Sequence, residues 1–186
     1  KTTNFYEFRE WTKLNFPLHC HYTFEVVFVS SGCITIEKEE AVYRLTAGDA
    51  IAIMPFEKHS FITESDSHIF MFQISPKLIS NWDLCLAGKT LKIPYRHFSD
   101  VMLESIYRKL KYTDGNLIEL NCIFFSLMDS FLDNNELVAY YQPDNICLEA
   151  LLYISEHFNE NLTLENMASA LNVSYVYLSR VFTKKL

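Results

Sequence analysis

Most of the residues best suited to bind a metal ion or a polar ligand lie in the segment 19–32, HCHYTFEVVFVSSG. His19 and His21 are two positions apart, so in an extended strand both side chains point to one face. Glu25 has the same parity and joins them if the strand is unbroken, and His59 supplies a third imidazole. Three imidazoles and one carboxylate are a suitable donor set for Zn, Fe, Mn, Ni or Cu. The same four residues could instead form a hydrogen-bonded polar cluster, or contact a polar or acidic organic effector.

The elements that must position these residues are short strands. Five segments are rich in β-branched and aromatic side chains, namely residues 24–30, 33–37, 41–45, 50–54 and 68–74. Turn signals such as Ser31-Gly32 and Gly48-Asp49 separate them at intervals of about 8 to 12 residues. This spacing predicts a sandwich or barrel. Parallel βαβ units are excluded because no helical segment separates the strands.

A helical pattern begins after a connector at residues 76–94, in which we expect one more strand at residues 90–93. Apolar residues recur at three- and four-residue spacings over residues 98–110 and again over residues 117–131. We expect these two helices to form an antiparallel hairpin. Its apolar surface is larger than a single sheet face needs, although both helices could also pack only on their own barrel.

The last 25 residues, 162–186, have the pattern of a helix-turn-helix and follow a further helix expected at residues 148–158. The pattern combines a small residue between the helices, a turn residue that tolerates a left-handed backbone, a helix cap and two apolar residues on the second helix: Ala168, Asn172, Ser174, Leu178 and Val181. The alternative is an ordinary antiparallel helix pair. Five matching positions in the right order favour the helix-turn-helix.

The second helix of such a motif enters the major groove of DNA. The candidates for DNA contact are the exposed residues of this helix: Tyr175, Val176, Ser179, Arg180 and Lys184. Arg180 could form a bidentate contact with guanine, or pair with a glutamate or a phosphate. Lys184 could contact a phosphate or remain solvated. The whole chain has a net charge of −7, but every charged side chain from Ser174 onward is basic. The basic surface is therefore local, and this segment alone should bind DNA weakly.

Composition places limits on the class of protein. Of the 186 residues, 49% are hydrophobic and 21% are charged, as in an ordinary soluble globular protein. No apolar run reaches the 18 or more residues of a membrane span, and no secretory leader is evident, so we expect a cytoplasmic protein without a membrane partner. The five cysteines are scattered, which argues against a disulfide framework and against a structural zinc site.

The histidine segment resembles the cupin superfamily. The cupin pattern HxH, three residues, Glu, six residues, Gly is matched from His19 to Gly32, and its second pattern is matched at Gly48, Pro55 and His59. The sequence departs from the cupin pattern at Glu57, near where Gly is usual, and at Thr63, in place of the closing Asn. In metal-binding cupins the four matched positions are ligands, which the resemblance assigns to His19, His21, Glu25 and His59.

A cupin followed by a helical hairpin and a helix-turn-helix resembles the AraC family of transcription regulators, and SYVYLSRVFTKKL resembles the first recognition helix of that family. The resemblance implies a barrel that senses a small-molecule effector, a hairpin that forms a homodimer, and base contacts from Val176, Ser179 and Arg180, with Tyr175 on a phosphate. It implies no required cofactor, although a divalent metal in the barrel stays open. Members carry two helix-turn-helix units, so we expect the second to lie beyond Leu186.

We therefore predict an α+β protein with a cupin-like β-barrel and N-terminal arm at residues 1–96, a helical hairpin at 97–134, a linker at 135–145 and the first helix-turn-helix at 146–186. Closure of residues 1–12 of the arm over the pocket is a hypothesis that the sequence does not decide. The predicted function is that of a DNA-binding regulator and not of an enzyme. The alternatives are a metal-dependent cupin enzyme of the oxygenase or isomerase type, and a dimeric binding protein that never touches DNA.

Overall fold

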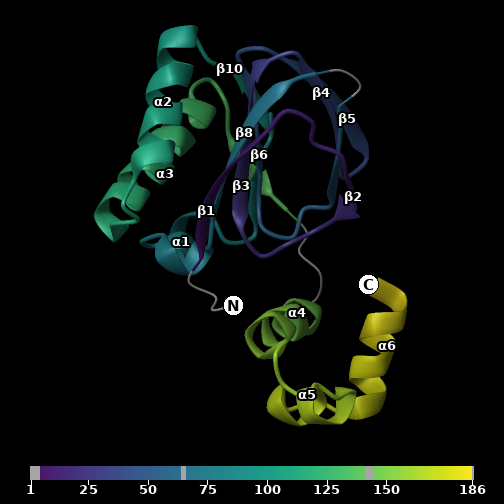
Figure 1. Cartoon of the computed structure of the whole chain (residues 1–186). Helices are drawn as coiled ribbons and strands as arrows, with labels where there is room; N and C mark the ends of the chain where they lie inside the picture. Colours follow the sequence, from purple (N-terminus) through teal and green to yellow (C-terminus); the bar gives the residue numbers. More distant parts are fainter. Residues whose placement is uncertain (1–4, 64–65, 141–144, 186) are drawn as a thin grey trace. The chain divides into compact units, whose positions relative to one another are not determined.

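The computed structural model describes residues 5–63, 66–140 and 145–185, with the side chains of residues 145, 148, 155, 156, 184 and 185 left out (Figure 1). The chain divides into two compact units, the first ending at Ala139 and the second beginning at Tyr140. The predicted barrel and the predicted hairpin therefore belong to one unit. The two units are described separately below.

The first unit contains two antiparallel sheets that face each other. The five-stranded sheet has the order β1 (Tyr6–Trp11), β8 (His68–Ile74), β3 (Phe24–Ser31), β6 (Asp49–Ile53) and β10 (Tyr95–His97). The four-stranded sheet has the order β2 (Phe16–His19), β7 (His59–Ile62), β4 (Cys33–Lys38) and β5 (Ala41–Thr46). The α+β fold class and the five strongest strands are confirmed, whereas β1, β2, β7 and β10 were not predicted.

Both faces of the five-stranded sheet are buried. On β3, the side chains of Phe24, Val26 and Phe28 belong to one hydrophobic cluster. Val27 and Val29 belong to a second cluster between the two sheets. Because successive side chains of a strand point to opposite faces, a single strand contributes to both cores. Its near-continuous apolar sequence follows from this double burial.

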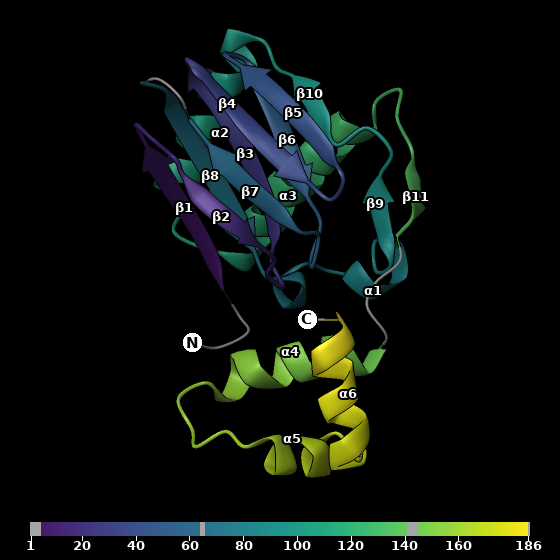
Figure 2. The same cartoon turned by 90° about the vertical axis from the view of Figure 1, so that its right-hand side faces the viewer.

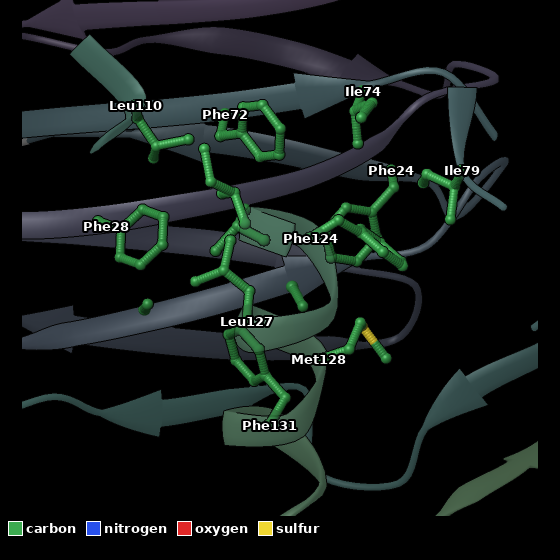
Figure 3. Close-up of a cluster of buried hydrophobic side chains, with 14 of the residues drawn as sticks. Phe24, Phe28, Phe72, Ile74, Ile79, Leu110, Phe124, Leu127, Met128 and Phe131 are labelled. Carbon is green, nitrogen blue, oxygen red and sulfur yellow. The ribbon is translucent and has the colours of Figure 1, made fainter. Parts of the chain in front are cut away.

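The first of these clusters is completed by the helices α2 (Asp100–Tyr112) and α3 (Leu117–Leu132). They lie on the face of the five-stranded sheet that is turned away from the four-stranded sheet, so the unit has three layers (Figures 1 and 2). The side chains of Phe124, Leu127 and Phe131 reach from α3 toward β3, which carries Phe24 and Phe28 (Figure 3). The apolar hairpin surface is thus largely used against its own sheet.

The helices begin where the sequence provides caps. The hydroxyl of Ser99 accepts from the backbone N–H of Met102 at 3.4 Å, and the side chain of Asn116 accepts from Ile118 at 2.8 Å. Each satisfies a backbone donor that the first helical turn leaves without a partner. Between the helices Gly115 has φ +80°, a left-handed backbone that favours glycine, and a β-carbon there would also overlap the Tyr6 ring.

Two predictions for the connecting segments need correction. In the connector at 76–94 the expected strand is present as β9 (Lys89–Leu91), but the segment also contains a 3₁₀ helix (Pro76–Leu78) and a short helix α1 (Trp82–Cys85), which were not predicted. The predicted linker at 135–145 begins with a strand, β11 (Leu137–Ala139), which pairs with β9. The partner of this strand is about 48 residues earlier in the chain, so its pairing leaves no local signal. Residues 141–144 of the predicted linker lie outside the described residues.

The second unit consists of α4 (Asn145–His157), α5 (Leu164–Ala170) and α6 (Tyr175–Lys185). The predicted features of the helix-turn-helix are confirmed. Asn172 has φ +54°, and the Ser174 hydroxyl accepts from the N–H of Tyr177 at 3.2 Å. The remaining three positions are buried in one core with residues of α4: Ala168, Leu178 and Val181. None of the helices in the described part of the chain is both long and apolar enough to cross a membrane.

Candidate functional site

The structure brings His19, His21, Glu25 and His59 together between the two sheets. His19 ends β2 and His59 begins β7, and the two are directly paired in the ladder. Their ring centroids are 4.2 Å apart, and the centroid of His21 is 4.9 Å from that of His59. One donor atom from each of the three imidazoles lies within 4.8 Å of the others. The convergence predicted from the cupin pattern is therefore present.

The predicted route to this convergence was wrong in one respect. Residues 19–25 are not one continuous strand, because β2 ends at His19 and β3 begins at Phe24. His21 lies in the bend between these strands, and Glu25 belongs to the opposite sheet from His19. The bend turns the chain from one sheet to the other, so the four side chains meet across the barrel and not along one strand.

The orientation of two imidazoles is fixed by backbone carbonyls. Nδ1 of His19 donates to the carbonyl of Pro17 at 2.8 Å, and Nδ1 of His59 donates to the carbonyl of Glu57 at 2.8 Å. Since a carbonyl can only accept, both rings carry their proton on Nδ1, and each Nε2 presents a lone pair. Metal-binding histidines are typically held in this way.

His21 can adopt either neutral tautomer because Thr23 offers both a donor and an acceptor. Nδ1 of His21 lies 2.9 Å from the Thr23 hydroxyl and 3.1 Å from the Thr23 carbonyl. With the hydroxyl donating to Nδ1, Nε2–H donates to Oε2 of Glu25 at 2.9 Å. With Nδ1–H donating to the carbonyl, Nε2 of His21 is unprotonated. It then presents a third lone pair, beside those of His19 and His59. His21 is therefore suited both to a hydrogen-bonded cluster and to a cation site.

The carboxylate of Glu25 is completely buried. Its Oε2 also accepts from the side-chain amide of Gln73, whereas its Oε1 lies 4.0 Å from Nε2 of His59. Oε1 of Glu25 and Nε2 of His59 are buried, and neither has a hydrogen-bond partner within the described part of the chain. Two unpaired acceptors that face each other are costly unless a donor or a cation lies between them.

Burial controls the protonation of this pair. Burial lowers the pKa of His59 to about 4 and outweighs the opposing effect of Glu25, so the imidazole is neutral at neutral pH. Burial also acts to raise the pKa of Glu25, but the hydrogen bond from His21, the neighbouring imidazoles and Gln73 hold that pKa below its usual value. At neutral pH the site combines one carboxylate with imidazole lone pairs.

These residues fit a divalent cation in their chemistry. A metal–nitrogen distance of about 2.0–2.1 Å allows two ligand atoms to be at most about 4.2 Å apart. The imidazole donors span up to 4.8 Å. The side chains would therefore have to close by roughly half an ångström on binding a metal.

A cavity of about 200 Å³ opens beside the cluster. One part of its wall is polar and is formed by Arg9, His19, His21, Glu25 and Gln73. The other part is apolar and is formed by Trp11, Leu14, Phe16, Phe61 and Met71. Sequence reasoning did not single out Arg9 or Gln73 as site residues, whereas Trp11 belongs to the arm in the closure hypothesis. Residues 1–4 of the arm lie outside the described residues, and β1, which follows them, contributes Arg9 and Trp11 to the wall.

The predicted DNA-binding residues lie on α6. Tyr175, Val176 and Arg180 are exposed and Ser179 is half-buried, while Leu178 and Val181 on the opposite face are buried. Lys184 lies in the last turn of the helix, and its side chain is outside the described residues. As residues that contact DNA, all five stay predictions.

Comparison with known proteins identifies the family. Residues 6–104, just over half of the chain, match the family described as the AraC-like ligand binding domain. The chain belongs to the AraC family. A comparison with curated protein sequences found no match.

Solved structures show the same fold. A crystal structure of apo ToxT K231A from Vibrio cholerae has 10% sequence identity and a TM-score of 0.61, covering 100% of this chain and 76% of ToxT. A 1.65 Å structure of ToxT from Vibrio cholerae has 10% identity and a TM-score of 0.62, covering 96% of this chain and 74% of ToxT. A wild-type ToxT structure from Vibrio cholerae with bound unsaturated fatty acid has 11% identity and a TM-score of 0.60. It covers 96% of this chain and 72% of ToxT. The chain is thus an AraC-family, ligand-sensing type of regulator with a cupin-like N-terminal domain.

Proposed function

We propose that this protein is a transcription regulator that binds a small effector in its barrel and binds specific DNA sequences through α6. The observation that carries the proposal is the cavity, in which a polar wall built around Glu25 faces an apolar wall, inside an AraC-type ligand-binding domain. The exposed Tyr175, Val176 and Arg180 on a helix-turn-helix support the DNA-binding part. The expected site of action is the cytoplasm.

The effector is a small molecule with one polar end and an apolar body. The cavity volume of about 200 Å³ is below the roughly 300–1,000 Å³ of pockets for drug-sized ligands. A hydrogen-bond donor on the ligand would satisfy Oε1 of Glu25 and Nε2 of His59, which otherwise lack partners among the described residues. The fatty acid named for the ToxT structure supports an apolar body, by analogy of fold alone.

The hairpin is the proposed homodimer contact. Although the inner faces of α2 and α3 pack on their own sheet, Val101 is 81% exposed and Ile118 is 76% exposed. Phe125 is 42% exposed and lies on the same helix as Ile118. A shallow cleft of about 190 Å³ lies between the two helices and includes Met102 and Ile106. Exposed apolar side chains that gather into one patch mark protein contacts, and a dimer would place two recognition helices on repeated half-sites.

A metal-dependent role of the barrel is the second candidate. It is favoured by the Nδ1–H tautomers of His19 and His59, which leave each Nε2 with a lone pair, and by the convergence of donor atoms from His19, His21 and His59. The ion would be held by His19, His21, Glu25 and His59, and it would act as a Lewis acid. No cofactor is required for effector binding as proposed. A cupin enzyme of the oxygenase or isomerase type would need this ion, whereas a regulator could use it as its signal.

Metal analysis separates these candidates. Protein purified without an affinity tag or chelator is measured for bound metal alongside His21→Ala. Near-stoichiometric metal that is lost in His21→Ala would support a metal sensor or an enzyme. Substoichiometric metal that is unaffected by the substitution would support an organic effector, and a ligand screen by thermal shift would follow.

DNA binding is tested by selecting sequences from a random duplex library with the full chain. An enriched motif is expected, and Arg180→Ala should weaken binding to it by about 5- to 150-fold, which corresponds to one bidentate base contact. Arg108→Ala is the matched control, because Arg108 is an exposed arginine of the first unit that pairs with Glu104. A library that shows no enrichment would refute sequence-specific binding by this chain.

A further inference from the structure

A buried ion pair lies next to the histidine cluster. Lys38 is 6% exposed and Glu57 is 1% exposed, and Nζ of Lys38 lies 2.8 Å from Oε1 of Glu57. The hydroxyl of Thr90 donates to the same oxygen at 2.5 Å. The N–H of Met54 donates to Oε2 at 2.7 Å. The carboxylate of Glu57 therefore has partners from β4, from β9 and from the end of β6.

The backbone of Glu57 contacts the site directly. Its carbonyl accepts the hydrogen bond from Nδ1 of His59 at 2.8 Å. The preceding residue, Phe56, has φ +67°, and its N–H donates to the carbonyl of His21 at 2.8 Å. A bulky residue with a left-handed backbone persists only where its surroundings hold it. The carboxylate of Glu57 is such a restraint on this loop, because it is buried and accepts from three donors.

Stability alone does not account for the ion pair. Replacing a buried ion pair by apolar side chains of similar volume is often neutral or stabilising, since desolvation offsets the attraction between the charges. A buried carboxylate with three donors is, however, well suited to fix the geometry of the loop that carries it. In this chain the loop delivers the carbonyl that sets the tautomer of His59.

We infer that Glu57 is a positioning residue of the barrel site, and that Lys38 and Thr90 hold its carboxylate. In this role Glu57 fixes its own carbonyl opposite Nδ1 of His59. The proton of His59 then stays on Nδ1, and Nε2 presents its lone pair toward Glu25. The inference rests on the proposed function, in which His59 belongs to the effector or metal site. It gives a structural reason for the departure from the cupin pattern at Glu57.

The test records the state of His59 without any ligand. The full chain is labelled with ¹⁵N-histidine and studied by NMR in a chelator-containing buffer, and His59→Gln identifies the signals of this ring. Wild-type protein is expected to show the Nδ1–H tautomer, with a ring proton that exchanges slowly with water. Thr90→Val preserves the shape of the side chain and removes one donor, and Glu57→Gln preserves the shape and removes the charge. Thr35→Val, at another strand threonine of the same unit, is the matched control.

Thr90→Val and Glu57→Gln are expected to speed exchange of the His59 ring proton about five- to tenfold, the equivalent of one hydrogen bond. Thr35→Val should leave the rate within about twofold of wild type. Should Glu57→Gln fail to fold, Thr90→Val decides alone. The inference is overturned if wild-type His59 is not the Nδ1–H tautomer, or if the folded variants keep the wild-type exchange rate. A protein that passes this test but binds neither metal nor effector would refute the proposed function and leave the positioning role intact.

Discussion

Acidification is expected to destabilise the first unit through His59. Burial lowers the pKa of this imidazole to about 4 in the folded protein, whereas its usual value is 6.5. Above pH 6.5 the ring is neutral in both states and contributes nothing to the pH dependence. Between pH 6.5 and 4 the unfolded chain binds a proton that the folded chain does not, so stability falls as the pH falls. Below about pH 4 both states are protonated and the loss is complete.

The size of this effect follows from the two pKa values. They differ by about 2.5, and each whole unit of pKa is worth about 1.4 kcal/mol, so the loss amounts to about 3 kcal/mol. This is a large part of the roughly 5–15 kcal/mol that stabilises a typical domain. Glu25 adds to the loss at lower pH, because a carboxyl with a depressed pKa stabilises the fold above its unfolded pKa and loses that contribution as the pH falls.

The assay is urea unfolding at a series of pH values in the presence of a chelator. Trp11 and Trp82 are the two tryptophans of the chain and both lie in the first unit, so their fluorescence reports that unit. The change in unfolding free energy between pH 7 and pH 4 should be about 3 kcal/mol smaller in His59→Gln than in wild type. His157→Gln, in the second unit, serves as the control. Parallel profiles of wild type and His59→Gln would refute the assignment of a neutral, buried His59.

Three further predictions concern packing and helix ends. Phe124 is fully buried and its ring centroid lies 5.0 Å from that of Phe24, so Phe124→Ala should lower the unfolding free energy by about 3–5 kcal/mol in urea. The neighbouring Phe125→Ala should cost less than about 1.5 kcal/mol, and equal losses would contradict the burial described here. Ser174→Ala removes the cap of α6 and should cost about 1 kcal/mol, read from faster hydrogen exchange of α6 amides; unchanged exchange would mean that the cap is unimportant. Asn172→Val should lower protection of α5 and α6 by about 1–2 kcal/mol because of the left-handed backbone, while Asn172→Gly should change it little, and equal effects of both would rule out backbone strain as the cause.

The sequence predicts the three helices of the second unit best, because the contacts that define them are between residues close together in the chain. Asn172, Ser174 and Leu178 each act through partners within a few residues or on the adjacent helices. The strands β3, β4 and β8 were also predicted, because they are long, rich in β-branched or aromatic residues and bounded by turns. β7 and β10 were missed because they contain only four and three residues.

The sequence predicts that the four residues of the cluster lie together, but not the geometry in which they meet. The cupin pattern correctly groups His19 with His59, but alternation along the chain cannot reveal the bend that moves Glu25 to the other sheet. Gln73 reaches Glu25 only because β8 pairs with β3 in the register Glu25↔Gln73. Such long-range registers leave no mark in the local sequence. The same holds for Glu57, whose partners Lys38 and Thr90 are 19 and 33 residues away.

The double burial of the five-stranded sheet has a consequence for how ligand selectivity could be altered. On β3, β6 and β8 the even-numbered side chains, such as Phe28, Ala52 and Phe72, pack toward the hairpin. The odd-numbered ones, such as Val27, Ile53 and Met71, face the barrel interior. Mutagenesis or natural drift limited to odd positions can thus reshape the barrel interior beside the cavity, while the packing of the sheet against α2 and α3 stays intact. Changes at even positions would instead reach the proposed dimer surface first, so recognition and assembly can diversify on separate faces of the same three strands.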